Sequence, residues 1–345
     1  AIKKLTSERI PTIGVLTTDR TMFSDGASIV REAIEKQYQV NVMEYTEAIN
    51  LNEIDTLIVY QPENVSKNVV YAIDQFIMNG GEGLFLVDQH KIDGLQVTKI
   101  NTGIDSMLSH YGVTIEHALT MDRSNSAASF SSGFVNFTLP YPFWPKLLKK
   151  NFLTDHPILQ KIETFVLPWS SPLKYKVQAN KEATFTTLAS TTKNAWTQKE
   201  PYNLNPQQKF KPTAYEQYPM VVNVTGTLAS FFSDNQLETS TPFKTTNSDS
   251  NILIVGNSTF ITNQMVQQFP NNKTVLLNLL DFLTLDNDIF GIPNRINADS
   301  PIRNVPDSVK PIIKWSTTLF FPICITFYGL IRYWVIKKSK EVTNR

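Results

Sequence analysis

The sequence predicts an α/β protein. A mostly parallel sheet flanked by helices is joined to a β-rich second lobe and to one C-terminal transmembrane helix. Three observations support this class. Buried-strand patterns alternate with helical stripes over residues 1–122. Residues 123–250 are rich in Ser, Thr, Asn, Pro and aromatic residues. Residues 315–331 contain no charged residue, and about 20 largely apolar residues suffice for a helix to cross a bilayer.

The first part of the α/β domain, residues 1–122, contains four predicted strands and three predicted helices. Short runs of apolar or alternating residues indicate strands at 12–17, 39–45, 56–60 and 83–88. Apolar residues at helical spacing indicate helices at 29–38, 66–79 and 104–111. Ser66 is suited to cap the start of the second helix, and Gly80 and Gly81 are suited to end it. This alternation is typical of a largely parallel sheet covered by helices on both faces.

The pattern changes at residue 123. Strand-like runs occur at 129–139, 184–189 and 220–232, separated by Asn- and Pro-rich loops. We therefore expect residues 123–250 to form a β-rich lobe or a long insertion. Residues 251–285 then resume the earlier pattern, with a strand at 251–255 and a helix carrying leucines at 276, 279, 280 and 283. This unit is predicted to close the α/β domain, and residues 286–311 are predicted to be a juxtamembrane linker.

The C-terminal segment predicts a membrane anchor at 312–336 and a basic cytoplasmic tail at 337–345. Positive charge is concentrated at or beyond the end of the span, and fewer, partly balanced basic residues precede it. The residues after the span are Arg332, Lys337, Lys338, Lys340 and Arg345. Because loops rich in Lys and Arg stay in the cytoplasm, we expect the main domain to face outwards.

Composition excludes several function classes. The chain has 32 basic and 31 acidic residues, a net charge of +1, which argues against a broad nucleic-acid surface. The one Cys, Cys324, lies inside the predicted span, so the main domain has no disulfide and no Cys nucleophile. No P-loop, dinucleotide fingerprint or nucleophile-elbow motif occurs, and the four His show no metal-binding spacing. We expect no cofactor and no metal.

Polar residues at the predicted strand ends are the candidates for a binding crevice. Ligands of open parallel sheets bind beyond the carboxyl ends of the strands. The candidates at these ends are Asp19, Asp88, His90, Asn257 and Ser258. Asp88, His90 and Ser258 suggest an acid, base and nucleophile set. The alternative, which we favour, is that these residues cap turns, because Asp and Asn are common turn formers.

Partner contacts are predicted in two places. The motif at 141–145 (YPFWP) contains two prolines and three aromatic rings, which either fill a core or face a partner, and the core is favoured. Its contact candidates are Tyr141, Phe143 and Trp144. The span adds Trp315, Pro322, Gly329 and Arg332, because small and polar residues help helices to pack within a membrane.

Several segments together resemble the GldG family, the auxiliary subunits of ABC transport systems named for gliding motility. They are residues 5–9 (LTSER), 72–81 (AIDQFIMNGG), 84–88 (LFLVD), 108–113 (LSHYGV), 141–144 (YPFW), 155–158 (DHPI), 218–222 (YPMVV) and 255–258 (VGNS). Each motif is weakly specific, but their order and spacing cover nearly the whole chain. An Arg-terminated spanning helix completes the resemblance.

The resemblance implies a bacterial envelope protein in the cytoplasmic (inner) membrane, with its domain on the periplasmic side. It also implies an ABC permease partner and, through that permease, a cytoplasmic ATPase. The implied α/β fold is class I amidotransferase-like or flavodoxin-like. Those amidotransferases carry a Cys at the strand-to-helix elbow, where this chain has Asp88 after the strand, so their chemistry does not carry over. Family members usually have a membrane segment before the position of Leu5, which implies a processed or trimmed start at Ala1.

Three functions follow from these observations. The first is a non-catalytic ABC-transporter accessory subunit whose domain binds envelope proteins or substrate. The second is a membrane-anchored hydrolase that uses Asp88, His90 and Ser258. The third is a glycan- or peptide-binding module. We favour the first, because the span is present and the catalytic motifs are missing.

Overall fold

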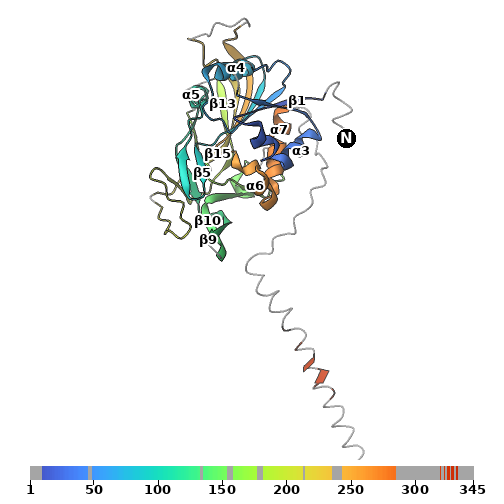
Figure 1. Ribbon diagram of the computed structural model, residues 1–345, viewed down its shortest axis with the longest axis vertical. Coiled ribbons are helices and arrows are strands. Elements are labelled where there is room, and N and C mark those ends of the chain that lie inside the picture. Colours follow the sequence, from blue (N-terminus) through green and yellow to red (C-terminus); the bar gives the residue numbers. More distant parts are fainter. Residues whose placement is uncertain are drawn as a thin grey trace, which may run out of the picture. The chain divides into compact units, whose positions relative to one another are not determined.

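The computed structural model describes residues 10–45, 49–132, 135–153, 158–176, 182–212, 214–234 and 243–284, and residues 319, 322, 325, 326, 328, 329 and 332. The chain divides into two compact units, Ala1–Ile292 and Pro293–Arg345. The first contains all the described strands, and its arrangement is shown in Figure 1.

A seven-stranded sheet forms the centre of the first unit. Its strands, in spatial order, are β13 (Ala183–Ser190), β15 (Pro219–Ala229), β16 (Thr246–Val255), β4 (Glu82–Leu86), β3 (Thr56–Tyr60), β1 (Thr12–Thr17) and β2 (Gln39–Glu44). From β16 to β2, each neighbouring pair is parallel, whereas β15 pairs antiparallel with both β13 and β16. The order β2-β1-β3-β4-β16 follows the 2-1-3-4-5 order of one common class of doubly wound sheets.

The inner parallel strands β1, β3 and β4 are buried on both faces, as their sequences predict, whereas the edge strand β2 is half-buried or exposed along its length. β3 (TLIVY) is buried at every position, which is typical of a parallel strand covered by helices on both sides. The predicted strands at 12–17, 39–45, 56–60, 83–88 and 251–255 all fall within the main sheet, with shifts at their ends. The prediction of an α/β protein with a mixed, mostly parallel sheet flanked by helices is confirmed.

Two helical layers cover the sheet. The helices are α2 (Arg20–Ser24), α3 (Ser28–Glu35), α4 (Lys67–Met78), α5 (Asp105–His110), α6 (Asn263–Gln268) and α7 (Asn271–Thr284), with short 3-10 turns η1 (Lys149–Asn151) and η2 (Thr259–Ile261). Apolar residues of α3, α6 and α7 share one core cluster with the strands, and those of α4 and α5 share another. Figure 1 shows α3, α6 and α7 gathered on one side and α4 on the other.

Four smaller sheets complete the first unit. They are β11 (Thr164–Val166), β10 (Val135–Leu148) and β9 (Asn125–Ser132); β12 (Leu173–Tyr175) with β7 (Val113–Ile115); β14 (Ala195–Gln198) with β8 (Leu119–Asp122); and β5 (His90–Asp93) with β6 (Gln96–Lys99). Of the residues 129–139, predicted as one strand, 129–132 belong to β9 and 135–139 to β10, and these two strands pair antiparallel and are green in Figure 1.

The stretch 123–250 contributes both to a sheet of its own and to the main sheet. The three-stranded sheet of β9, β10 and β11 lies wholly within it. β15 pairs with β16 and β13 pairs with β15, so both strands extend the main sheet, while β9 and β10 belong to the smaller sheets. Part of this stretch therefore completes the α/β sheet, because β16 inserts beside β4 and leaves its other edge open to β15.

Candidate functional site

The carboxyl ends of β4 and β16 bring together three of the predicted crevice residues. These two strands are parallel neighbours, and Leu86 lies opposite Val255 at their ends. Val87 continues the pairing through a backbone hydrogen bond to the carbonyl of Val255, at 3.1 Å. Asp88 therefore emerges beside the turn that contains Asn257 and Ser258.

Asp88 is the acceptor at the centre of this turn. Its carboxylate accepts from the backbone N–H of Ser258 at 2.9 Å, from the Ser258 hydroxyl, and from the Asn257 side-chain amide at 3.3 Å. Asn257 also donates to the carbonyl of Pro168 at 2.7 Å and accepts from the Phe260 N–H at 3.0 Å. Both Asn257 and Ser258 are fully buried. These bonds tie the turn after β16 to the end of β4.

Burial governs the electrostatics of this carboxylate. Loss of solvation raises the pKa of Asp88 to about 6, and the hydrogen bonds from Ser258 and Asn257 oppose that shift. Burial, with a smaller effect from the charge of Asp88, also raises the pKa of Tyr60 above its usual value. Asp88 is thus a weakly acidic, half-buried carboxyl group whose oxygens already have donors.

His90 belongs to a different set of contacts. It begins β5 and is 5% exposed, and its Nε2 lies 2.6 Å from the Tyr202 hydroxyl. The ring of His117 packs edge-on at 6.5 Å between centroids. Burial lowers the pKa of His90 to about 4, with further effects from His117 and Lys99, so its imidazole is neutral at neutral pH.

The predicted acid, base and nucleophile set is not assembled. Among the hydrogen bonds of the described residues, none joins His90 to Asp88 or to Ser258. The Ser258 hydroxyl donates straight to Asp88, so no imidazole stands ready to take its proton. The hypothesis that these three residues act as one unit is therefore wrong. Asp88 and Ser258 hydrogen-bond to each other and hold the turn after β16, whereas His90 lies in the β5–β6 hairpin and contacts Tyr202.

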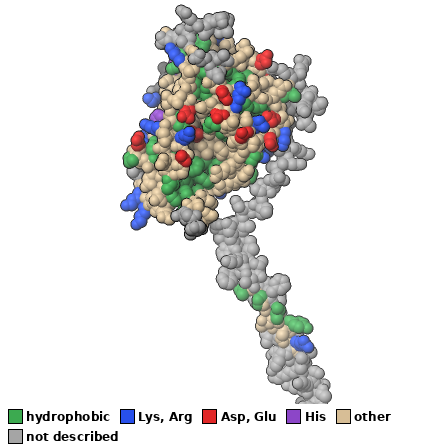
Figure 2. All heavy atoms as spheres, viewed as in Figure 1, with side chains coloured by type: hydrophobic (Ala, Val, Ile, Leu, Met, Phe, Trp, Pro, Cys, Tyr) green, Lys and Arg blue, Asp and Glu red, His purple; other side chains and the backbone are tan. Residues whose placement is uncertain are grey.

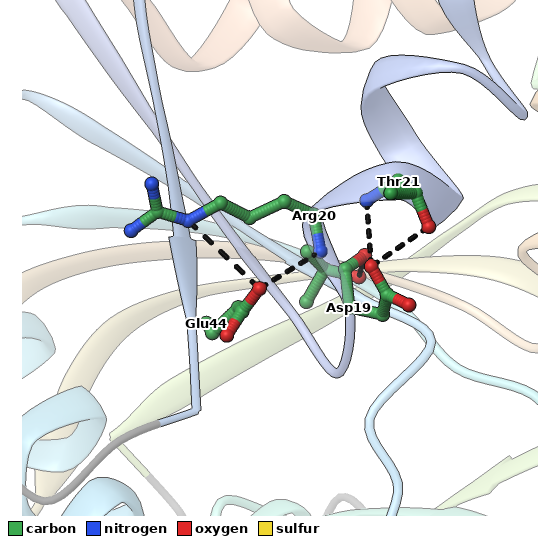
Figure 3. Close-up of polar contacts among 5 residues, drawn as sticks. Asp19, Arg20, Thr21 and Glu44 are labelled. Carbon is green, nitrogen blue, oxygen red and sulfur yellow. Dashed lines mark hydrogen bonds and ion pairs between the residues drawn. The ribbon is translucent and has the colours of Figure 1, made fainter.

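Asp19 caps a helix at the end of β1. Its carboxylate accepts from the Thr21 N–H at 2.8 Å and from the Thr21 hydroxyl at 2.7 Å, which makes it the N-cap of α2. These bonds lower the pKa of Asp19. Beside it, Glu44 accepts from the Arg20 N–H at 3.4 Å and pairs with the Arg20 guanidinium at 4.0 Å (Figure 3). In this view the Asp19–Thr21 contacts cap α2, and the Arg20–Glu44 contacts join the start of α2 to the end of β2.

The aromatic motif lies in the core. Tyr141, Phe143 and Trp144 are 1%, 0% and 4% exposed. They sit where the pairing of β10 with β9 shifts, so that Tyr141 pairs with Ser126 and Pro145 with Asn125. Their role as contact candidates is therefore corrected, because such buried side chains offer a partner no surface.

The surface around the first unit carries charges of both signs. Figure 2 shows acidic and basic side chains interspersed on the visible face, with apolar side chains between them. This face lacks the single-sign patch typical of a nucleic-acid interface. Within the described parts of the chain, no group of three or more His, Cys, Asp or Glu side chains is arranged to hold a metal ion.

The predicted span falls mostly outside the described residues, and Trp315 lies among those that are not described. Pro322, Gly329 and Arg332 are helical and exposed within the second unit, and the Thr326 hydroxyl donates to the Pro322 carbonyl at 2.8 Å. None of the helices formed by the described residues combines enough length and apolar character to cross a bilayer.

Two residues important to the structure were missed from the sequence. Asp74 is fully buried in α4, between Val70 and Ile77 on the helix face that packs on the sheet. Asp74 follows Val70 by four residues and precedes Ile77 by three, so the helical spacing itself indicates that its carboxylate is buried. Tyr202 lies in a loop rich in Asn and Pro, where no periodicity indicates its contact with His90.

Residues 10–284 match the protein family described as "ABC-type uncharacterized transport system". A Borreliella burgdorferi protein described only as uncharacterized is 23% identical over 352 residues, covering 96% of this chain and 67% of that protein.

Two solved structures are similar at low identity. The mmIFT52 N-terminal domain has a TM-score of 0.50 at 12% identity, covering 80% of this chain and 98% of that one. A putative ThuA-like protein from Bacteroides uniformis has a TM-score of 0.45 at 11% identity, covering 81% and 92%. The first likeness concerns the fold alone. The family match, in contrast, spans most of the sequence, and the chain belongs to the family of auxiliary components of ABC-type transport systems.

Proposed function

We propose that the chain is a non-catalytic, membrane-anchored accessory subunit of a bacterial ABC transporter, of the GldG type that serves gliding motility or envelope transport. The observation that carries this proposal is the family match over residues 10–284, which includes every strand of the main sheet. The sequence has no P-loop, so ATP hydrolysis falls to a separate cytoplasmic ATPase that the chain reaches through a permease.

The proposed location is the cytoplasmic (inner) membrane, with the main domain on the periplasmic side. The uncharged run at 315–331 and the basic residues that follow it support an anchor at 312–336 with a cytoplasmic end. In this arrangement the anchor contacts lipid and packs laterally on the permease, and the domain binds envelope proteins or the transported substrate.

The contacts of the strand-end residues support a non-catalytic role. Asp88 holds the Ser258 turn, Asp19 caps α2, and His90 is held by Tyr202. A hydrolase remains the second candidate, since the raised pKa of Asp88 gives it some capacity as a base near Ser258. Asp88→Asn and Ser258→Ala separate the two, because an accessory subunit keeps its partner complex in both variants, whereas a hydrolase that uses these residues loses bond cleavage in both.

Co-purification tests the proposal. The tagged full chain is extracted from its own cells in a mild detergent, and its partners are identified by mass spectrometry. We expect an ABC permease and its ATPase in the purified complex. A matched variant replaces residues 312–336 with an unrelated spanning helix. We expect it to stay in the membrane and to recover less permease, whereas equal recovery shows that the span is a passive anchor.

A further inference from the structure

The outer side of β2 is an open edge of the main sheet. β2 pairs in parallel with β1 on one side, and no strand formed by the described residues pairs with its other side. At its two ends, the Gln39 N–H donates to the carbonyl of Pro11 at 3.0 Å, and the Tyr45 N–H donates to the carbonyl of Thr17 at 3.2 Å. Residues with odd numbers therefore bond to β1 along this strand, because only alternate residues of a strand bond to one neighbour.

The same alternation decides which backbone groups face the open side. The N–H and C=O groups of Val40, Val42 and Glu44 lie between those that bond to β1, so they point away from it. Within the part of the chain that the structure describes, no strand pairing or backbone hydrogen bond reaches them from that side. A row of such groups is a template for pairing with another strand.

The opposite edge of the main sheet is protected, and β2 is not. The pairing of β13 with β15 shifts register twice, and the Leu153 N–H donates to the carbonyl of Leu188 at 2.8 Å, which covers part of that edge. In contrast, β2 pairs with β1 without a shift over six residues and contains no Pro and no Lys. Its one charged residue, Glu44, is engaged by Arg20 at the strand end (Figure 3). Native proteins blunt exposed edges with bulges, Pro or charges, so an edge without them indicates a partner strand.

We propose that β2 pairs with β2 of a second copy of the chain, antiparallel about a two-fold axis at Asn41. In this register, Val40 of each copy lies opposite Val42 of the other, and the outward N–H and C=O groups of both residues bond across the interface. Opposed β-branched residues suit an antiparallel pair. The two Glu44 carboxylates lie at opposite ends of the paired strands. A register centred on Val42 is less favourable, because it places Val40 opposite Glu44.

The surroundings of β2 favour a second copy over a strongly charged partner. Val40 and Val42 are half-buried and pack against the core cluster that contains Val30 and Ile34 of α3, so the valines of a second copy lengthen an apolar row. Charged side chains on α3 and its C-cap balance in sign, and they are Arg31, Glu32, Glu35 and Lys36. Two copies of such a helix do not repel each other, whereas helices of one charge sign do.

The size of the edge predicts a weak dimer. A strand of six residues is about 20 Å long, and its edge offers less than the roughly 800 Å² per partner of a typical stable interface. Two copies held in one membrane by the anchor proposed above meet at a high effective concentration, which compensates for the small contact. Covalent trapping in the membrane is therefore the suitable measurement.

Disulfide cross-linking in membranes tests this pairing. The background is Cys324→Ser, which removes the one native thiol, and the test variant adds Asn41→Cys. Asn41 is exposed and forms a non-hydrogen-bonded pair with its own copy on the axis, where the two Cα atoms lie about 4.5 Å apart, within reach of a disulfide. The matched control is Gln39→Cys, exposed on the same face of the same strand, whose two copies lie about 14 Å apart in this register.

We expect oxidised membranes to contain a disulfide-linked dimer of the Asn41→Cys chain and little dimer of the Gln39→Cys chain. Adding Val42→Pro to Asn41→Cys should lower the yield of dimer about tenfold, because each copy loses a donor across the interface. The same change leaves the ladder to β1 intact, since the Val42 N–H faces outwards. Urea unfolding of each variant checks that its domain is folded.

The proposal is overturned if folded Asn41→Cys chains give no dimer, if Gln39→Cys gives as much, or if Val42→Pro changes nothing. Capture of a different protein by Asn41→Cys also overturns it, because the edge then belongs to another partner. The pairing needs no permease, and co-purification with the permease needs no second copy, so each experiment can fail while the other succeeds.

Discussion

The hydroxyl of Ser258 donates directly to the carboxylate of Asp88, with no histidine between them. The two residues follow neighbouring parallel strands and are 170 residues apart in the chain. Their contact, reinforced by the Ser258 backbone N–H at 2.9 Å, fastens the turn after β16 to the end of β4. A pair that looks reactive in the sequence is in this way a structural contact between two strand ends.

Asp88→Asn should change how stability depends on pH. Burial raises the pKa of Asp88 from 3.8 to about 6 in the folded chain, so its stabilising contribution is complete below pH 3.8 and is lost as the pH rises through 6. The stability of the unsubstituted chain relative to the variant should therefore fall between about pH 4 and pH 7. The fall should be at most about 3 kcal/mol, because Asp88 keeps some exposure. Urea unfolding at both pH values measures it.

The Asp88→Asn comparison isolates one group, because all other ionisable residues are shared and their effects cancel. Asn retains an oxygen that can accept from the Ser258 N–H, so the turn should persist. If the difference in unfolding free energy between the two chains stays constant from pH 4 to pH 7, the pKa of Asp88 is not raised by desolvation in the folded chain.

Asp74→Ala should destabilise the first unit strongly. The Asp74 carboxylate is fully buried and accepts from the Tyr111 hydroxyl at 2.8 Å, the Ser230 hydroxyl at 2.7 Å and the Phe231 N–H at 2.7 Å. Removing it leaves three donors without an acceptor, which should lower the free energy of unfolding by about 3 kcal/mol or more. Asp93→Ala, at an exposed position of β5, is the control and should change it by less than about 0.5 kcal/mol. Equal losses of unfolding free energy in the two variants would show that the hydrogen bonds to Asp74 do not stabilise the fold.

Much of the sheet is readable from the sequence, because each parallel strand is a short apolar run. The predicted strand at 56–60 coincides with β3, and the helix at 66–79 nearly coincides with α4. The pairing of these elements is less accessible. Local periodicity carries no information on where β16 enters the sheet, so it could not show that β13 and β15 extend the sheet.

Part of the candidate site could also be predicted from the sequence. Parallel strands place their carboxyl ends at one edge of the sheet, so Asp88, Asn257 and Ser258 were expected to lie close together. His90 was grouped with them because it is two residues from Asp88. The β5–β6 hairpin, whose strands are only four residues each, turns it towards Tyr202 instead.

Gly256→Ala should disturb the same turn by steric overlap. A Cβ at this position would lie 2.1 Å from the carbonyl oxygen of Ser171, a backbone atom that cannot move alone. We expect a loss of about 2 kcal/mol in unfolding free energy. Gly94→Asn provides the contrast, because that site has φ +57° and open space around it, and Asn tolerates this conformation. Comparable losses in the two variants would refute the close approach.

Trp144→Ala should act as a core substitution. Trp144 is 4% exposed and packs edge-on against Trp169 at 5.3 Å and Phe269 at 6.1 Å between centroids. Its truncation should cost about 3–5 kcal/mol, measured by urea unfolding with far-UV circular dichroism. Tyr215→Ala removes an aromatic ring that is 45% exposed and should cost about 1 kcal/mol, mainly through its contact with Arg123. A stable Trp144→Ala chain that loses only its partners would restore the contact hypothesis.

The most direct test of the central claim is the amount of ABC permease and ATPase recovered with the tagged full chain, quantified by mass spectrometry. The chain carrying both Asp88→Asn and Ser258→Ala is purified in parallel from cells of matched expression. A non-catalytic accessory subunit predicts that both partners are enriched with the unsubstituted chain and equally with the variant, and that transport is retained. Recovery of neither partner from chains that are folded and membrane-bound would contradict the account.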